Sequence, residues 1–465
     1  MRSAPVAEAL PGWTRRAGIS APLQIMQSRG GLSSTEVARQ RPVRLFMSGP
    51  AAGVIGGTIT GRMAGAQDLI TIDIGGTSSD IALVSKGDPV IRPEGLIDGF
   101  PVRVPMVDVN AIGAGGGSIA WLDAAGGLRV GPQSAGSDPG PAAYGRGGND
   151  ATVTDASLVL GYLDPAYFAG GTVALDVARA REVIARKIAA PLGMTVEQAA
   201  LGIHRVINAQ MVEGIRLVSI RQGFDARAFT LVALGGAGPV HATALARELG
   251  IASVVIPRFP GVLSAVGLLA ARTEHEVAIS FRARIGDVAL DAVQQVLHDL
   301  DARCAALMAH EGAVSAAVTT RYFADVWYRG QSYFLEVPLL LDDPEPLGRL
   351  YRGFVALHDR VYGYSTDSPA DIVNLRVTHS AGGADTLDDS DYHPATGRAE
   401  KPSRSILVAG SVAPLEARVF DRACLPVGTT FRGPAIVEQA DTTTLLEPGW
   451  RAKVLHDGNL MLRPE

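Results

Sequence analysis

The residues best suited to chemistry stand together at positions 73–80, which read Asp-Ile-Gly-Gly-Thr-Ser-Ser-Asp. Two adjacent glycines in a tight turn expose backbone N–H groups, and the hydroxyl groups of Thr77 and Ser78 add donors, so the turn suits a phosphate. Asp73 ends an apolar run, where a buried carboxylate is costly unless it serves a cation. Together with Asp80 it offers hard oxygen ligands that suit Mg²⁺, commonly through water. An ordinary β-hairpin with an Asx turn is the alternative interpretation.

A second glycine-rich segment lies at 233–239, Ala-Leu-Gly-Gly-Ala-Gly-Pro, after an apolar run and before a helical pattern. Such a turn lets a flat ring or a phosphate approach the backbone and the helix N-terminus. Tight packing of a strand against a helix explains the pattern equally well. A third segment, 260–270, reads as a loop leading into a helix of small residues, for which close packing is the better explanation.

The elements that must position these segments alternate between strand and helix patterns. Short strands are expected at 70–74 and 80–84 on either side of the first turn, and a buried strand at 229–235 before the second. Helices are expected at 48–67, where small residues dominate, and at 195–223, where Thr195 and Gln198 form a capping box. The pattern predicts an α/β unit whose glycine turns lie at strand ends.

Near residue 280 the pattern changes. A helix is expected at 287–311 and another near 345–361, and the other runs are strand-like up to the end of the chain. We therefore predict two domains: residues 1–280 form the α/β unit, and residues 281–465 form a β-rich α+β domain.

Composition excludes several classes of protein. The chain of 465 residues is 47% hydrophobic and 19% charged, which favours packed cores over disorder. Its net charge of −5, without a long basic run, makes nucleic acid an unlikely ligand. The two cysteines, Cys304 and Cys424, are too few for a disulfide framework, and no segment is long and apolar enough for a membrane span. We expect a cytoplasmic location.

The order of the three segments resembles one lobe of the actin, hexokinase and sugar-kinase ATPase class. Longer stretches narrow the match: LQIMQSRGG at 23–31, SGPAAGVIGG at 48–57, TIDIGGTSSDIAL at 71–83, VGPQSAGSDPGPAAYGRGG at 130–148 and LVALGGAGPVHA at 231–242. Together they resemble the hydantoinase A family, which includes 5-oxoprolinases, N-methylhydantoinase subunits and ATP-dependent ketone carboxylase subunits. GPAIVEQADTTTLLEPGW at 433–450 resembles the C-terminal domain of that family.

The resemblance implies an actin-like (ribonuclease H-like) ATPase lobe, within 1–280, followed by the β-rich domain. Members of the family usually begin with another lobe that carries its own Asp-x-Gly-Gly-Thr hairpin. This sequence has one such hairpin, at 73–80, and its neighbours match the second. One wall of the nucleotide cleft would therefore be missing unless a separate polypeptide supplies it.

The resemblance also implies the chemistry. ATP phosphorylates the carbonyl oxygen of a cyclic amide, or a ketone enolate in the carboxylases, and the activated carbon then reacts more easily. Catalysis of this kind depends on positioning and on stabilising charge. Asp73 and Asp80 would hold Mg²⁺. The remaining residues implied to bind ATP are Gly75, Gly76, Thr77 and Ser78 around the phosphates and Gly235, Gly236 and Ala237 beside the adenosine.

Three further polar residues lie in stretches that resemble the family. Asp108 precedes the GAGGGS loop at 113–118, and Asp155 lies in the TVTD segment; both are candidates for contact with substrate, metal or water. The alternative for Asp155 is that it caps the helix that follows, since Asp is a preferred N-cap residue. His241 is a candidate for the cleft, with a structural role at least as favoured.

The leading hypothesis is a subunit of an ATP-dependent cyclic amidase that works with a hydantoinase B type subunit on a small cyclic amide. An ATP-dependent carboxylase acting on a ketone is the second hypothesis, because substrate choice depends on pocket contacts and on the partner. A scaffold without catalytic activity is the third.

Overall fold

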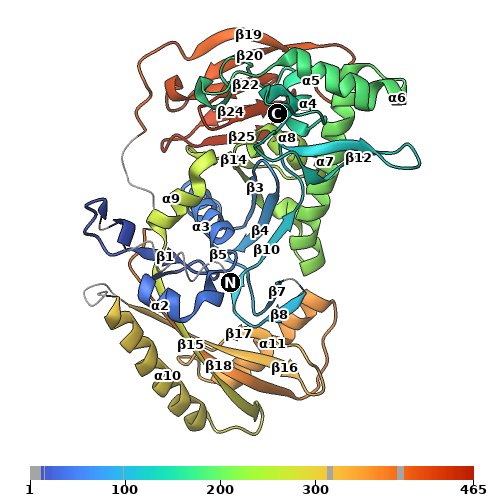
Figure 1. Ribbon diagram of the computed structural model, residues 1–465. Coiled ribbons are helices and arrows are strands. Elements are labelled where there is room, and N and C mark those ends of the chain that lie inside the picture. Colours follow the sequence, from blue (N-terminus) through green and yellow to red (C-terminus); the bar gives the residue numbers. More distant parts are fainter. Residues whose placement is uncertain (1–11, 15, 98, 312–317, 385–391) are drawn as a thin grey trace.

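The computed structural model describes residues 12–14, 16–97, 99–311, 318–384 and 392–465, and its centre is a nine-stranded mixed sheet (Figure 1). β3 (Leu69–Ile74) lies near the middle, antiparallel to β4 (Ser79–Ser85) and parallel to β13 (Thr230–Leu234). The residues of β3 are buried on both faces of the sheet, which explains their nearly continuous apolar run. The other strands of this sheet are β5 (Asp88–Pro89), β10 (Val109–Ile112), β14 (Val254–Ile256), β21 (Thr430–Arg432), β24 (Trp450–Val454) and β25 (Leu460–Pro464).

Helices cover both faces of this sheet. On one face, α3 (Ser48–Met63) packs against β3 and β13 and is crossed closely by α9 (Leu263–Ala270). On the other face lie α7 (Val196–Val218) and α8 (Gly238–Leu249). Alternate residues of β3 face the two layers, since Ile70, Ile72 and Ile74 belong to the core beneath α7 and α8. Leu69 belongs to the core beneath α3. The odd-numbered residues of β3, Asp73 among them, therefore face α3.

Shorter elements complete this part of the chain. The structure confirms the capping box of α7, in which Thr195 and Gln198 exchange hydrogen bonds, although the helix ends at Val218 rather than at residue 223. The remaining helices here are α2 (Thr35–Gln40), α4 (Val153–Val159), α5 (Val177–Ile184) and α6 (Ala190–Leu192). The remaining strands are β6 (Ile91–Arg92), β7 (Gly95–Ile97), β8 (Phe100–Val102), β9 (Met106–Val107), β11 (Ser118–Leu122) and β12 (Leu128–Ser134).

A second, six-stranded sheet lies below the first in Figure 1 and has the order β1-β2-β15-β18-β16-β17. Both of its long helices, α10 (Leu290–His310) and α11 (Pro346–Tyr362), contribute to one apolar core on the same face. Its strands are β1 (Gln24–Met26), β2 (Leu32–Ser34), β15 (Thr273–Arg284), β16 (Thr319–Tyr328), β17 (Leu335–Pro338) and β18 (Ala370–Ala381).

The opposite face of this second sheet is polar and carries a buried ionic network. Arg376 on β18 bonds Asp325 on β16 and Glu276 on β15, and Arg29 from the β1–β2 turn bonds Glu276 and Glu336. These side chains are at most 13% exposed. The network therefore joins the start of the described chain to the sheet formed by residues 273–381.

Strands from each end of the chain join the sheet of the other predicted domain, across the boundary predicted at residue 280. β1 and β2 belong to the second sheet, while β21, β24 and β25 extend the first sheet beyond β14. A further four-stranded sheet consists of β19 (Glu400–Ile406), β20 (Leu415–Asp421), β22 (Ala435–Glu438) and β23 (Thr443–Leu446). The division at 280/281 stays a prediction. None of the helices in the described ranges is long and apolar enough to cross a membrane.

Candidate nucleotide-binding site

The paired carboxylates of the first glycine segment lie directly opposite each other on neighbouring strands. Asp73 on β3 is the register partner of Asp80 on β4, and the turn between them closes with a 3.0 Å hydrogen bond from the N–H of Gly75 to the carbonyl of Ser78. Residues opposite each other in an antiparallel pair point to the same face of the sheet. The segment is thus a β-hairpin, as predicted, with two acidic side chains at its base.

Burial shapes the protonation of this pair. Desolvation, together with the charge of Asp80, raises the pKa of Asp73 to about 6. Desolvation also raises the pKa of Asp80. No cation within the described residues forms an ion pair with either carboxylate or lowers its pKa. Two adjacent, half-buried carboxylates without a cationic partner are suited to bind a hard cation.

A second glycine loop, residues 113–118, packs against the hairpin turn and bonds its backbone. The N–H of Gly116 donates to the carbonyl of Gly75 at 3.0 Å, and the N–H of Gly117 donates to that of Gly76 at 2.6 Å. Both carbonyls of the turn are therefore engaged by protein. The N–H groups of Gly76 and Thr77 donate to no described residue, which leaves them available to an anion.

The close contact between loop and turn gives a testable prediction. A Cβ at position 115 would lie 2.7 Å from the N atom of Thr77 and 2.8 Å from the carbonyl oxygen of Gly75. We expect Gly115→Ala to displace the turn and to lower the free energy of unfolding by about 1–3 kcal/mol, measured by urea denaturation. Gly286→Ala is the matched control, since a Cβ there meets open space. Equal stability of the two variants would contradict the role of Gly115.

The second glycine segment folds against the first. The N–H of Gly235 donates to the carbonyl of Pro260 at 2.9 Å, and the N–H of Ala237 donates to that of Ile74 at 3.0 Å. Gly235 has φ +80°, and a Cβ there would lie 2.4 Å from Oδ1 of Asp73. Glycine is required at this position for both reasons. The turn therefore lies beside the carboxylate pair, and α8 begins directly after it at Gly238.

These segments converge on one cavity of about 250 Å³. Its wall includes the hairpin turn, Gly116 of the second loop, and Gly236 and Ala237 of the turn before α8. The remaining wall contains three aromatic residues, Tyr144, Tyr167 and Phe168, and residues 439–443. A cavity with glycine backbone on one side and aromatic rings on the other fits a flat heterocycle that carries phosphates.

The C-terminal part of this wall was missed by the sequence reasoning. Thr442 donates from Oγ1 to the carbonyl of Gly236 at 2.9 Å, and Asp441 accepts from the N–H of Gly261 at 2.8 Å. In the sequence, the segment 433–450 shows only a resemblance to a C-terminal domain. Nothing in its residue pattern indicates that it packs against a turn 206 positions earlier in the chain. That contact depends on the strand pairs of the first sheet.

None of the four predicted catalytic carboxylates lines this cavity, and two of them, Asp155 and Asp108, are bound by other parts of the protein. Asp155 is fully buried at the third position of α4 and accepts bonds from the N–H groups of Ala142, Ala143 and Thr152 and from the Thr152 hydroxyl. It belongs to a capping box whose N-cap residue is Thr152, so the capping interpretation describes its geometry. Because both of its oxygens accept bonds from protein groups, we leave it out of the proposed catalytic residues.

Asp108 is held at a distance from the carboxylate pair. It precedes β10, and its carboxylate accepts a 2.6 Å bond from Gln222 and lies 3.6 Å from Arg92. Asp80 pairs with Ala111, three residues further along β10, which corresponds to about 10 Å of strand. Asp108 does not line the cavity between the glycine segments.

His241 is buried in α8 and reaches the cavity wall. Its Nδ1 lies 2.7 Å from the side-chain oxygen of Asn208, and its ring stacks on that of His204 at 4.9 Å between centroids. Burial lowers the pKa of His241 to about 4. A neutral, hydrogen-bonded imidazole of this kind fits the structural role that the sequence analysis favoured.

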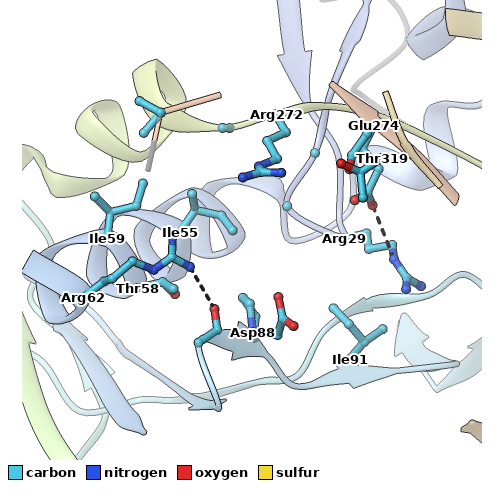
Figure 2. A pocket seen from close by; sticks show the side chains of 18 of the residues that line it. Arg29, Ile55, Thr58, Ile59, Arg62, Asp88, Ile91, Arg272, Glu274 and Thr319 are labelled. Carbon is cyan, nitrogen blue, oxygen red and sulfur yellow. Dashed lines mark hydrogen bonds and ion pairs between the residues drawn. The ribbon is translucent and has the colours of Figure 1, made fainter. Parts of the chain in front are cut away.

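A separate cavity of about 320 Å³ lies between α3, the β4–β5 turn and the start of β15 (Figure 2). Arg29, Arg62 and Arg272 point into it together with Asp88 and Glu274. Arg29 lies 3.4 Å from Glu274, and Arg62 donates to the carbonyl of Gly87. None of the predicted site residues lines this cavity.

The chain matches two family models along almost its whole length. Residues 7–277 match the model described as Hydantoinase/oxoprolinase, and residues 285–462 match the model described as Hydantoinase/oxoprolinase C-terminal domain. The chain is 35% identical over 455 residues to the caprolactamase subunit alpha of Pseudomonas jessenii, covering 96% of this chain and 65% of that one. It thus spans just under two thirds of the length of this relative.

Two solved structures share the fold. The ATP-dependent caprolactamase from Pseudomonas jessenii superposes with a TM-score of 0.89 at 34% identity, over 99% of this chain and 68% of that one. A nucleotide-free acetone carboxylase superposes with a TM-score of 0.78 at 26% identity, over 100% of this chain and 67% of that one. The mixed α/β fold expected from the sequence is confirmed at this level.

Proposed function

Because the chain belongs to the hydantoinase/oxoprolinase family, we propose that it is the nucleotide-binding part of an ATP-dependent cyclic amidase. Relatives of this chain include an ATP-dependent caprolactamase of known structure and a caprolactamase subunit alpha. The convergence of the glycine turns at 75–76, 116 and 236–237 on one cavity is the observation that carries the proposal, and Asp73 and Asp80 lie at the base of the first of these turns. The sheet with α3 and α9 on one face and α7 and α8 on the other is, on this proposal, an actin-like lobe.

The proposed nucleotide contacts follow the predicted residues. The N–H groups of Gly76 and Thr77 and the hydroxyl groups of Thr77 and Ser78 bind phosphate oxygens, because the carbonyls of the turn are already engaged. Gly236 and Ala237 line the adenosine side of the cavity. Gly235 contributes by its shape, since a side chain there would collide with Asp73. The aromatic residues Tyr144 and Phe168 complete the wall.

The carboxylate pair fits a magnesium ion that accompanies the nucleotide. Asp73 and Asp80 supply two oxygen donors, and the charge of a bound cation would offset their mutual repulsion. The described residues contain no group of three or more His, Cys, Asp or Glu side chains placed to hold a metal. The remaining ligands would be water and phosphate, which is how Mg²⁺ is usually held beside nucleotides.

The reaction that fits this site is activation of an amide carbonyl. The carbonyl oxygen of a cyclic amide takes the terminal phosphoryl group of ATP with release of ADP, and water adds to the activated carbon. The ring C–N bond then breaks to leave an amine and an acyl phosphate, which a second water hydrolyses to the carboxylate and inorganic phosphate. This chain positions the phosphates and stabilises their charge. A hydantoinase B type subunit and a polypeptide that forms the other wall of the cleft are the proposed partners.

A ketone carboxylase is the second candidate, supported by the superposition on acetone carboxylase. A scaffold without catalytic activity is the third. A test with the assembled complex separates the three functions. Release of an amino acid from a lactam, or of an N-carbamoyl amino acid from a hydantoin, supports the amidase. Bicarbonate-dependent consumption of a ketone supports the carboxylase, and the absence of both reactions supports the scaffold.

Calorimetric titration with Mg-ATP tests the nucleotide site directly. We expect saturable binding by the chain and a loss of affinity of at least about tenfold in Asp73→Ala, since one metal-coordinating carboxylate contributes roughly 1–2 kcal/mol or more. Asp150→Ala is the control, because Asp150 is half exposed and its one ion-pair partner among the described residues is Lys187. An absence of binding at millimolar nucleotide would reject the site in this chain.

A further inference from the structure

The edge of the second sheet is open along most of β15. β18 pairs with β15 over its whole length on one side, whereas β2 pairs with it only at Thr273 on the other. The carbonyl of Glu276 accepts a 3.3 Å bond from the guanidinium of Arg44, so it points away from β18. Backbone groups of alternate residues in a strand point to the same side. Those of Ala278 and Ser280 therefore also point outwards.

These outward backbone groups have no partner in the described part of the chain. Ala278, Ile279 and Ser280 are exposed, and none of the described residues bonds the N–H or C=O of Ala278 or Ser280 from the open side. Only beyond Ser280 does an irregularity in the pairing with β18 disturb the strand. Proteins usually cover or interrupt such an edge, because it is a template for another strand.

Arginines surround this open edge. A cavity of about 530 Å³ runs along it, and its wall contains six arginines, at positions 41, 44, 103, 282, 303 and 376, but only one acidic residue, Glu276. Glu276 is already bonded by Arg376 and approached by Arg44. Arg41, Arg282 and Arg303 have no carboxylate partner among the described residues, and the guanidinium of Arg282 lies over the ring of Trp327.

We propose that an extended, acidic segment of a partner polypeptide binds here as an additional strand beside β15. Its main chain would bond the N–H and C=O groups of Ala278 and Ser280, and its carboxylates would pair with Arg41, Arg282 and Arg303. A small anion accounts for the arginines but cannot donate to the outward carbonyls. A polypeptide supplies both donors and acceptors at the spacing of a strand, so it fits the whole surface.

The probe is a fluorescent hexapeptide of alternating Glu and Thr, titrated with the full chain at low salt and followed by anisotropy. We expect it to bind, and we expect a peptide with Lys in place of Glu not to bind. N-methylation of alternate amides along one edge of the Glu peptide should abolish binding, because it removes the strand-pairing donors. Inorganic pyrophosphate should compete only weakly.

Charge reversal locates the binding surface. The double variant Arg282→Glu/Arg303→Glu is expected to weaken binding by at least about tenfold, since two favourable ion pairs become repulsive. Arg451→Glu, on the exposed face of β24, is the matched control and should bind normally. Thermal unfolding followed by circular dichroism checks that both variants fold.

Three outcomes would overturn the proposal: no binding of the Glu peptide, equal binding after N-methylation, or equal binding by the double variant. Equal binding after N-methylation together with strong competition by pyrophosphate would identify an anion site instead of a strand site. The experiment contains no nucleotide, so its failure would leave the proposed amidase function untouched.

Discussion

Asp73→Asn is expected to stabilise the chain at neutral pH in the absence of nucleotide and metal. The carboxylate of Asp73 is desolvated and faces Asp80, and its pKa is raised to about 6 from an ordinary value of 3.8. A raised pKa means that the folded state binds the proton more tightly than the unfolded state. Ionisation at neutral pH therefore reduces stability, by on the order of 2 kcal/mol for a shift of this size.

The pH dependence distinguishes this effect from simple repacking. Below about pH 4 the carboxyl group is protonated in both states, and the variant should match the original chain. The difference should grow between about pH 4 and pH 6 and stay constant above that range, as measured by urea denaturation. Millimolar Mg²⁺ should stabilise the original chain and leave Asp73→Asn unaffected.

The exposed Asp150→Asn serves as the control and should show no such difference at any pH. The prediction fails if the difference in unfolding free energy between Asp73→Asn and the original chain is the same at pH 4 and pH 7. That result would show that the surroundings of Asp73 do not raise its pKa. Asp73 would then be a poor candidate for a metal ligand, because a bound cation is expected to offset the free energy lost when this buried carboxylate ionises.

Arg376→Met is expected to cause the largest loss of stability. Arg376 donates two bonds to Asp325, at 2.9 and 2.7 Å, and one to Glu276 at 3.1 Å. Asp325 is completely buried, and desolvation raises its pKa even beside Arg376. Removing the arginine leaves a buried carboxylate without its cation, which costs about 3–5 kcal/mol. Urea denaturation at pH 7 measures the change.

The double variant Arg376→Met/Asp325→Leu checks the physical reason. Removal of both charges should recover most of the lost stability, since an apolar pair tolerates burial better than a lone carboxylate. Arg329→Met is the matched surface control; its ion pair with Asp371 is largely exposed on the arginine side, and we expect a change of at most about 1 kcal/mol. A double variant no more stable than Arg376→Met would show that the loss comes from packing.

The sequence alone determined the local features of the candidate site. The hairpin at 73–80 and the turn before α8 form where the glycines and flanking apolar runs predicted them, because turn geometry and strand burial are properties of neighbouring residues. Capping at Thr195 is equally local and was also predicted correctly. The family followed from the same stretches, since long motifs survive in order along the chain.

Only the tertiary structure decided which distant residues meet. Asp155 and Asp108 have the residue type of catalytic groups, yet α4 engages the first in its capping box and Gln222 holds the second away from the cavity. Residues 439–443 form part of the cavity wall because β25 pairs with β14 and brings the end of the chain back to the first sheet. Long-range strand pairing and the burial that accompanies it are set by the whole fold, so no local pattern reveals them.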